Sequence, residues 1–93
     1  MKSYKFYFSV DQKRPAIEQK MMVQCLAKKY FEAFTIYNAV HFWQDKHETG
    51  LVLEVISGVS LRDKTSLLAL ELKAYLKQTE IFITWHEVNG DFF

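Results

Sequence analysis

The order of periodic segments is the feature that most constrains this chain. Residues 4–10 alternate in polarity, so that Tyr4, Phe6, Phe8 and Val10 share one face, as in a half-buried β-strand. Two further runs, FTIYNAVHFW and LVLEVISG, are rich in β-branched and aromatic residues, and EIFITWHEV forms a fourth. Helical spacing occupies the two intervals between these segments. The sequence therefore predicts the order β-α-β-β-α-β.

Two helices are expected, near Pro15 to Phe31 and near Ser60 to Lys77. Pro15 suits the first position of a helix, and Ser60 with Asp63 resembles a capping box. The apolar stripe of the first predicted helix consists of Val23, Leu26, Ala27, Tyr30 and Phe34. The second stripe consists of Leu61, Leu68, Leu72, Tyr75 and Leu76, widened by Leu67, Leu70 and Ala74.

For 93 residues, this order favours one domain, residues 1–93, with an α+β fold. The economical solution is a ferredoxin-like two-layer sandwich: a four-stranded antiparallel sheet of order 4-1-3-2 with both helices on one face. The second and third strands would form a hairpin around the polar loop QDKHETG, in which Gly50 could supply a positive φ and His47 would lie at the tip.

This arrangement leaves one face of the sheet without helices, which we call the open face. Strand parity places ten side chains on it: Lys5, Tyr7, Ser9, Val52, Glu54, Ile56, Phe82, Thr84, His86 and Val88. We predict that its binding residues are Tyr7, Val52, Glu54, Ile56, Phe82, His86 and Val88. A monomer seldom exposes so much contiguous apolar surface, so we expect a homodimer, packed through this face or through an edge strand. Lys5 and Glu54 could fix its register.

Composition excludes several classes of protein. The chain has 12 basic and 11 acidic residues, which gives no strong field of the kind that attracts nucleic acid. Cys25 is the only cysteine, so an internal disulfide is excluded. No apolar run approaches the roughly 18 residues of a membrane span, and the N-terminal residues do not resemble a signal peptide. We expect a cytoplasmic protein of a bacterial host, without membrane contact.

No catalytic or cofactor motif is apparent, and we expect no metal and no cofactor. His41 and His86 fall on opposite edges of a 4-1-3-2 sheet, too far apart to share a metal ion. Cys25 falls inside a predicted helix, where a buried cysteine usually acts as a small hydrophobe. An acylphosphatase-like anion loop would need an arginine with a glycine, whereas DQKRP has only Arg14. The chain is therefore predicted to be a non-enzymatic protein-binding module.

Nucleic acid is the alternative ligand, because RNA-recognition domains share this order of elements and stack bases on sheet aromatics. Tyr7 could be such a platform, but Val52, Glu54 and Ile56 occupy the next strand, where a carboxylate would repel phosphate. Nucleic acid is therefore not the favoured partner. The corresponding enzymatic alternative is a small nuclease or phosphodiesterase that uses His86 with Tyr7 or Glu54.

Three segments, YFEAFTIYNAVHFW, ETGLVLEVI and LKAYLKQTEIFIT, resemble small accessory proteins of bacteriophages and other mobile elements with the pattern YFdGaTIYeakGyw, EnsLvIEi and LkeaLNQEsIlv. Glu54 matches this pattern, while His41 and Thr79 depart from it. The resemblance implies a phage or plasmid setting and, by analogy, an inhibitor of a host defence system that acts by steric occlusion. The terminal aromatics Phe92 and Phe93 are expected to pack locally.

Overall fold

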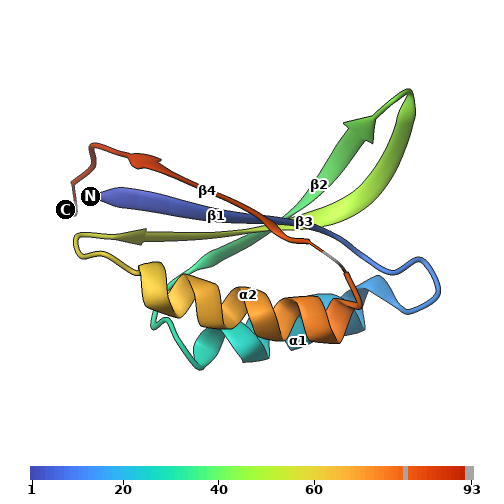
Figure 1. Cartoon of the computed structure of the whole chain (residues 1–93), viewed down its shortest axis with the longest axis horizontal. Helices are drawn as coiled ribbons and strands as arrows, with labels where there is room; N and C mark the ends of the chain where they lie inside the picture. Colours follow the sequence, from blue (N-terminus) through green and yellow to red (C-terminus); the bar gives the residue numbers. More distant parts are fainter. Residues whose placement is uncertain (79, 92–93) are drawn as a thin grey trace.

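The computed structural model describes residues 1–78 and 80–91. Its elements are β1 (Lys2–Ser9), α1 (Ala16–Lys28), β2 (Thr35–Trp43), β3 (Lys46–Ser57), α2 (Arg62–Leu76) and β4 (Phe82–Glu87). All neighbouring strands are antiparallel, and their order across the sheet is β2-β3-β1-β4. Both helices lie against one face of the sheet (Figure 1). The predicted ferredoxin-like sandwich, its strand order and its layering are confirmed.

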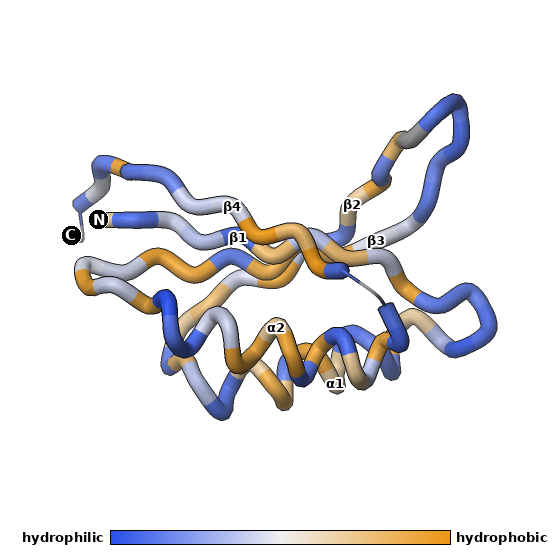
Figure 2. The backbone as a smooth tube through the Cα atoms, viewed as in Figure 1, coloured by the Kyte–Doolittle hydropathy of each residue, from blue (hydrophilic) through white to orange (hydrophobic). Residues whose placement is uncertain are grey.

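The core lies between the sheet and the helices, because alternate side chains of β1 and β3 point toward them. Phe6 and Leu53 are cross-strand partners and are fully buried. On the helix side, Val23, Leu68 and Leu72 are also fully buried. The hydropathy colouring shows this layer as hydrophobic segments of sheet and helix that face each other (Figure 2). Burying one such side chain contributes about 1.5 to 3 kcal/mol.

The turn of the central hairpin differs from the expectation. β2 and β3 are joined by Gln44 and Asp45 alone, both with positive φ, 49° and 64°. Two-residue hairpin turns commonly need positive φ at both central positions, because that twist matches the twist of the strands. The prediction that QDKHETG forms a loop turning at Gly50 was wrong: Gly50 and His47 both lie inside β3.

Because the turn has only two residues, β2 and β3 are longer than expected. The distal part of this hairpin, residues 39–50, projects from the body of the molecule. We call this part the arm. It turns away from the helix layer, and its tip stands clear of both helices (Figure 1). The helices therefore cover only the proximal part of β2 and β3.

The helices are shorter than expected, and their ends are made differently. α1 stops at Lys28, where bonds from Lys29 N to Leu26 O and from Tyr30 N to Ala27 O tighten the last turn. The capping box was wrong: within the described residues no side chain caps α2, whose N-cap position is Leu61. The Leu61 N–H instead donates to the Tyr4 hydroxyl at 3.2 Å.

Several predicted burials were also wrong. Leu67, Leu70 and Ala74 are exposed on the outer side of α2, because the sheet contacts only the stripe that contains Leu68 and Leu72. Cys25 is exposed on α1. The expectations about Thr79, Phe92 and Phe93 lie outside the described residues. No helix in the described part of the chain is long and apolar enough to span a membrane.

Candidate binding surface on the open face of the sheet

A hydrogen-bonded carboxylate lies on the open face where β1 and β3 run side by side. The Ser3 hydroxyl, which is fully buried, donates to Glu54 Oε2 at 2.6 Å. Lys5 is the cross-strand partner of Glu54, and its Nζ lies 3.9 Å from the same oxygen. Glu54 is therefore held in place by two neighbours, which makes it a fixed negative group on this face.

Glu54 also lines a cavity of about 430 Å³ at the end of the sheet where β1 begins and β4 ends. Phe34, Ile56 and Val88 form apolar walls, and Asn89 and Asp91 add polar groups. Pockets of roughly 300 Å³ and more accept small ligands when apolar walls surround a few placed polar groups. Three of the predicted binding residues, Glu54, Ile56 and Val88, thus meet in one cavity.

Aromatic side chains occupy the middle of the open face. The Tyr7 ring lies 5.8 Å from the Phe82 ring and 6.5 Å from the His41 ring, measured between centroids. Phe82 is 67% exposed. Val52 is paired with both Tyr7 and Tyr37 across the sheet and is only 3% exposed. The expectation that Val52 belongs to the exposed patch was wrong, because it lies between two larger neighbours.

A second polar group lies where the arm leaves the sheet. Ser9 Oγ donates to Glu48 Oε2 at 2.7 Å, and Glu48 is the cross-strand partner of His41. His41 Nε2 is buried and has no hydrogen-bond partner in the described part of the chain. Its ring lies over Gly50, where a Cβ would come within 2.3 Å of Nε2. Sequence reasoning missed this contact, although a glycine inside a strand often marks a close approach.

Of the residues proposed for catalysis, His86 and Tyr7 lie apart on the sheet. On β1, Ser3 is paired with His86, whereas Tyr7 is paired with Phe82 four residues further along. That separation is about 13 Å at the usual rise of a strand, so His86 and Tyr7 cannot act on one bond directly. His41 and His86 lie on the two edge strands, as predicted. Among the described residues, no three His, Cys, Asp or Glu side chains cluster with metal-binding geometry.

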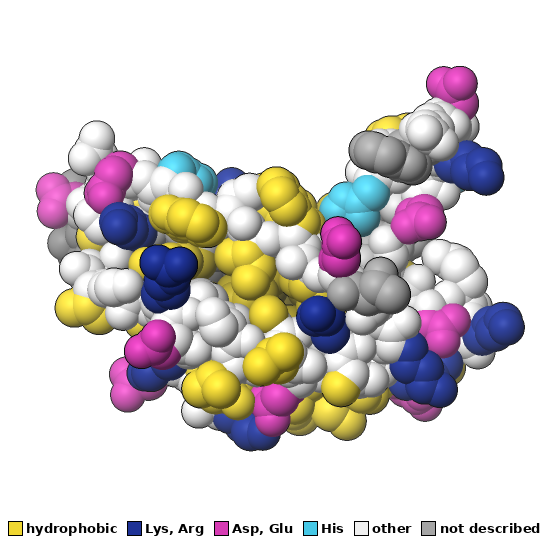
Figure 3. Space-filling model, in the orientation of Figure 1, with side chains coloured by type: hydrophobic (Ala, Val, Ile, Leu, Met, Phe, Trp, Pro, Cys, Tyr) yellow, Lys and Arg dark blue, Asp and Glu magenta, His cyan; other side chains and the backbone are white. Residues whose placement is uncertain are grey.

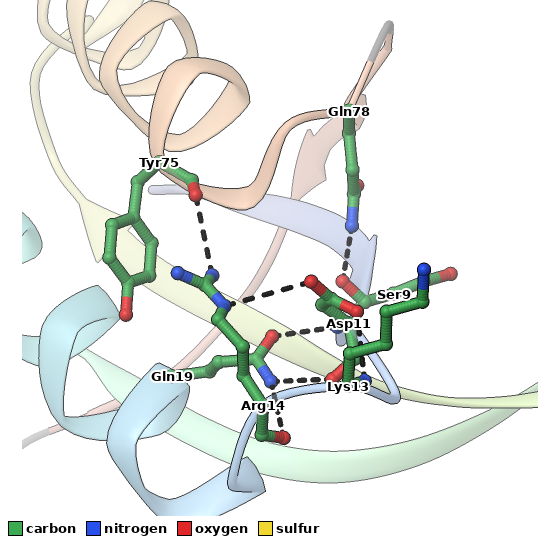
Figure 4. Close-up of polar contacts among 7 residues, drawn as sticks. All are labelled: Ser9, Asp11, Lys13, Arg14, Gln19, Tyr75 and Gln78. Atoms are coloured by element: carbon green, nitrogen blue, oxygen red, sulfur yellow. Dashed lines mark hydrogen bonds and ion pairs between the residues drawn. The ribbon is translucent and has the colours of Figure 1, made fainter.

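The β1–α1 loop, which binds anions in acylphosphatase-like proteins, is occupied by internal bonds here (Figure 4). The buried Gln19 amide donates to the carbonyls of Asp11 and Arg14 at 2.8 and 3.1 Å and accepts from Asp11 N at 2.7 Å. The Arg14 guanidinium lies over the Tyr75 ring, donates to the Tyr75 carbonyl and faces Asp11 at 3.7 Å. Arg14 therefore fastens the loop to the end of α2, and the sequence had not indicated the role of Gln19.

Apolar side chains are also exposed outside the open face. In the view of Figure 3, hydrophobic side chains follow β4 and the gap between β4 and α2. Trp85 on β4 and Leu70 on α2 are both more than 60% exposed. β4 is an edge strand with six residues, so its side chains have a neighbouring strand on one side only. Exposed apolar surface is therefore distributed over several elements.

No protein-family model matches this chain, and no curated protein matches it in sequence. Solved structures share its fold. A phage SAM lyase in its apo state is similar with a TM-score of 0.62 and 16% identity, over 91% of this chain and 78% of the other. A DUF3240 family protein from Shewanella baltica has a TM-score of 0.64 and 10% identity, over 98% and 96%. The periplasmic divalent cation tolerance protein CutA from Archaeoglobus fulgidus has a TM-score of 0.54 and 17% identity, over 99% and 88%. At these identities the likeness concerns the fold alone.

Proposed function

We propose that this chain is a non-enzymatic accessory protein of phage or plasmid type that binds a protein partner through the open face. The observation that carries this proposal is the arrangement of exposed Phe82 and Ile56 beside the fixed Lys5–Glu54 pair. Exposed aromatic and aliphatic anchors near oriented polar groups are typical of protein-binding surfaces. The phage setting is supported by the resemblance in the sequence and by the fold shared with a phage protein.

Inhibition of a host defence protein by steric occlusion, in the bacterial cytoplasm, is the finer form of this proposal. An inhibitor of this kind needs only a rigid surface, which the open face of the sheet can supply. The arm borders the open face and could limit which partners reach it (Figure 1). The chemistry of this face indicates what the partner should offer. We expect an apolar surface on the partner, with polar groups that complement the Lys5–Glu54 pair.

The test is affinity capture from a bacterial lysate with the wild-type chain and with two variants of the open face, Ile56→Glu and Phe82→Ser. Both residues are exposed, so both variants should fold. Leu70→Ser is the matched control, because the exposed fraction of Leu70 lies between those of Ile56 and Phe82, but Leu70 is on the outer side of α2. We expect a partner that the wild type and the control retain and that both open-face variants lose. A partner retained equally by all four proteins would contradict the proposal.

A second candidate function is an enzyme that acts on S-adenosylmethionine. Two observations favour it. The chain shares its fold with a phage SAM lyase, and in this chain Glu54 lines a mostly apolar cavity of about 430 Å³. S-adenosylmethionine carries a sulfonium, an ammonium and a flat purine, so a carboxylate among apolar walls suits its charge and its bulk. Glu54 would hold the positive charge of the bound substrate. Attack of the substrate's own carboxylate on the carbon of its amino-acid chain that is bonded to sulfur would form a lactone and break that carbon–sulfur bond, so that the sulfur leaves as a neutral thioether.

Incubation with S-adenosylmethionine, followed by chromatography of the remaining cofactor, separates the two candidates. If the second is correct, the wild type consumes S-adenosylmethionine, and Glu54→Gln lowers consumption at sub-saturating substrate at least about tenfold, because the variant loses the charge that attracts the cationic substrate. Glu48→Gln is the control, since Glu48 is also hydrogen-bonded to a serine but lies in the other polar group. If the wild type consumes no S-adenosylmethionine, the lyase hypothesis is refuted and the protein-binding proposal is unaffected.

A further inference from the structure

The arm continues the alternation of the core beyond the point where the core ends. Ile36 on β2 packs against the core, and Val40 and Phe42 have the same parity. No helix covers these two positions, so Val40 is 55% exposed and Phe42 is 76% exposed. An isolated two-stranded hairpin is marginally stable in water. We call this side of the arm, which carries Val40 and Phe42, its outer side. Its apolar side chains have no helix packed over them, although their alternation is that of buried residues.

A hollow lies at the base of the arm, on its outer side, between the arm and the first turn of α1. This cavity of about 260 Å³ is lined by Val10, Ala16, Ile17, Lys20, Asn38, Thr49, Gly50 and Leu51. Ile17 is 70% exposed at its rim. Asn38 and Val40 are next but one on the same strand, and Thr49 is the partner of Val40. The hollow and the outer side of the arm are therefore one continuous surface.

We propose that this surface binds a second copy of the chain, with the arm of each copy seated in the hollow of the other. Val40 lies midway between Asn38 in the hollow and Phe42 near the tip, about 6.6 Å from each at the usual rise of a strand. A two-fold axis close to Val40 therefore places Phe42 of one copy beside Asn38 of the other copy, at the hollow that Asn38 lines. The two-fold axis repeats this contact, so Phe42 of each copy is covered in a closed dimer.

The shape of this surface favours a second copy over a foreign partner. The same molecule provides both a projecting apolar side chain and an apolar hollow next to its own arm. This assembly leaves the open face free, so it does not depend on the proposed function and differs from face-to-face packing.

The first experiment measures molar mass by light scattering coupled to size exclusion. The wild type is expected at twice the 11.0 kDa of one chain, and Phe42→Ser at the mass of one chain with an unchanged circular dichroism spectrum. Phe82→Ser is the matched control: it removes a similarly exposed phenylalanine from the open face and should leave the dimer intact. A monomeric wild type, or a dimer that Phe42→Ser leaves intact, would overturn the proposal.

The second experiment tests the position of the axis by oxidative crosslinking. Val40→Cys in a Cys25→Ser background is expected to form a disulfide-linked dimer, because residue 40 of both copies lies beside the axis. Tyr37→Cys in the same background is the control, since Tyr37 has the opposite parity on the same strand and faces the open face. Preferential crosslinking through residue 37 would assign the interface to the open face and refute the arm.

Discussion

The imidazole of His41 lies over Gly50, its diagonal neighbour across the β2–β3 hairpin. A Cβ at residue 50 would come within 2.3 Å of His41 Nε2 and within 2.5 Å of the Phe8 carbonyl oxygen. The first neighbour is a side chain that can rotate, but the second belongs to the backbone of β1. Gly50 therefore permits the close approach of three strands at the base of the arm.

Gly50→Ala should lower the free energy of unfolding by about 1 to 3 kcal/mol, since overpacking forces side chains and backbone to shift. Urea denaturation measures the effect. Gly58→Ala is the control, because no described atom lies within 4 Å of a Cβ at that position. Adding His41→Ala should recover only part of the loss, since the contact with the Phe8 carbonyl remains. Equal stability of the Gly50 and Gly58 variants would contradict this account.

Gln19→Leu should destabilise the protein by about 1 to 3 kcal/mol. The amide of Gln19 is fully buried and satisfies one backbone N–H and two carbonyls of the β1–α1 loop, which leucine cannot do. Gln24→Leu, at an exposed position of the same helix, is the control and should change stability little. Hydrogen exchange at Asp11 should accelerate only in the Gln19 variant; unchanged protection there would show that another group holds the loop.

Ala27→Asp should prevent folding. Ala27 is fully buried between α1 and the sheet, and an unpaired charge there costs several kcal/mol. Small domains have only about 5 to 15 kcal/mol of total stability. Cys25→Asp places the same charge on the exposed side of α1 and should fold normally. Thermal melting followed by circular dichroism distinguishes the two, and a cooperative wild-type melt of the Ala27 variant would refute the assigned helix face.

Glu71 on α2 should make stability depend on pH in the acidic range. The hydrogen bond from Lys29 holds the pKa of Glu71 below its ordinary value of 4.5. Because the folded pKa is the lower one, the stabilisation is complete above that ordinary value and is lost as the pH falls through the folded pKa. The same ion pair raises the pKa of Lys29, so its contribution disappears only as the pH rises above 10.5.

The measurement compares the melting temperatures of the wild type and Glu71→Gln across this range. The wild type should melt higher at neutral pH, and the difference should shrink as acid protonates Glu71. Because Lys29 is exposed and Glu71 is partly exposed, added salt should also reduce the difference. A difference that stays constant down to strongly acidic pH would show that the glutamine changes packing and not charge.

The sequence by itself determined the order of elements and, for β1, β3 and β4, the side of the sheet to which each residue points. Alternation with period two and spacing near 3.6 are local properties, because they follow from the direction of each Cα–Cβ bond. Phe6 and Leu53 in the core, and Lys5 beside Glu54 on the open face, were therefore predictable. A right-handed crossover and a short chain then left one economical topology.

Only the tertiary structure decided which of those side chains are covered. Val40 and Phe42 have the parity of core residues but are exposed, because the helices end before the arm, whereas Val52 has the parity of the open face but is buried between Tyr7 and Tyr37. The contact of His41 with Gly50 likewise depends on the two-residue turn that sets the register. Burial is a property of distant neighbours, and the distance between segments in space is not encoded in the period of either one.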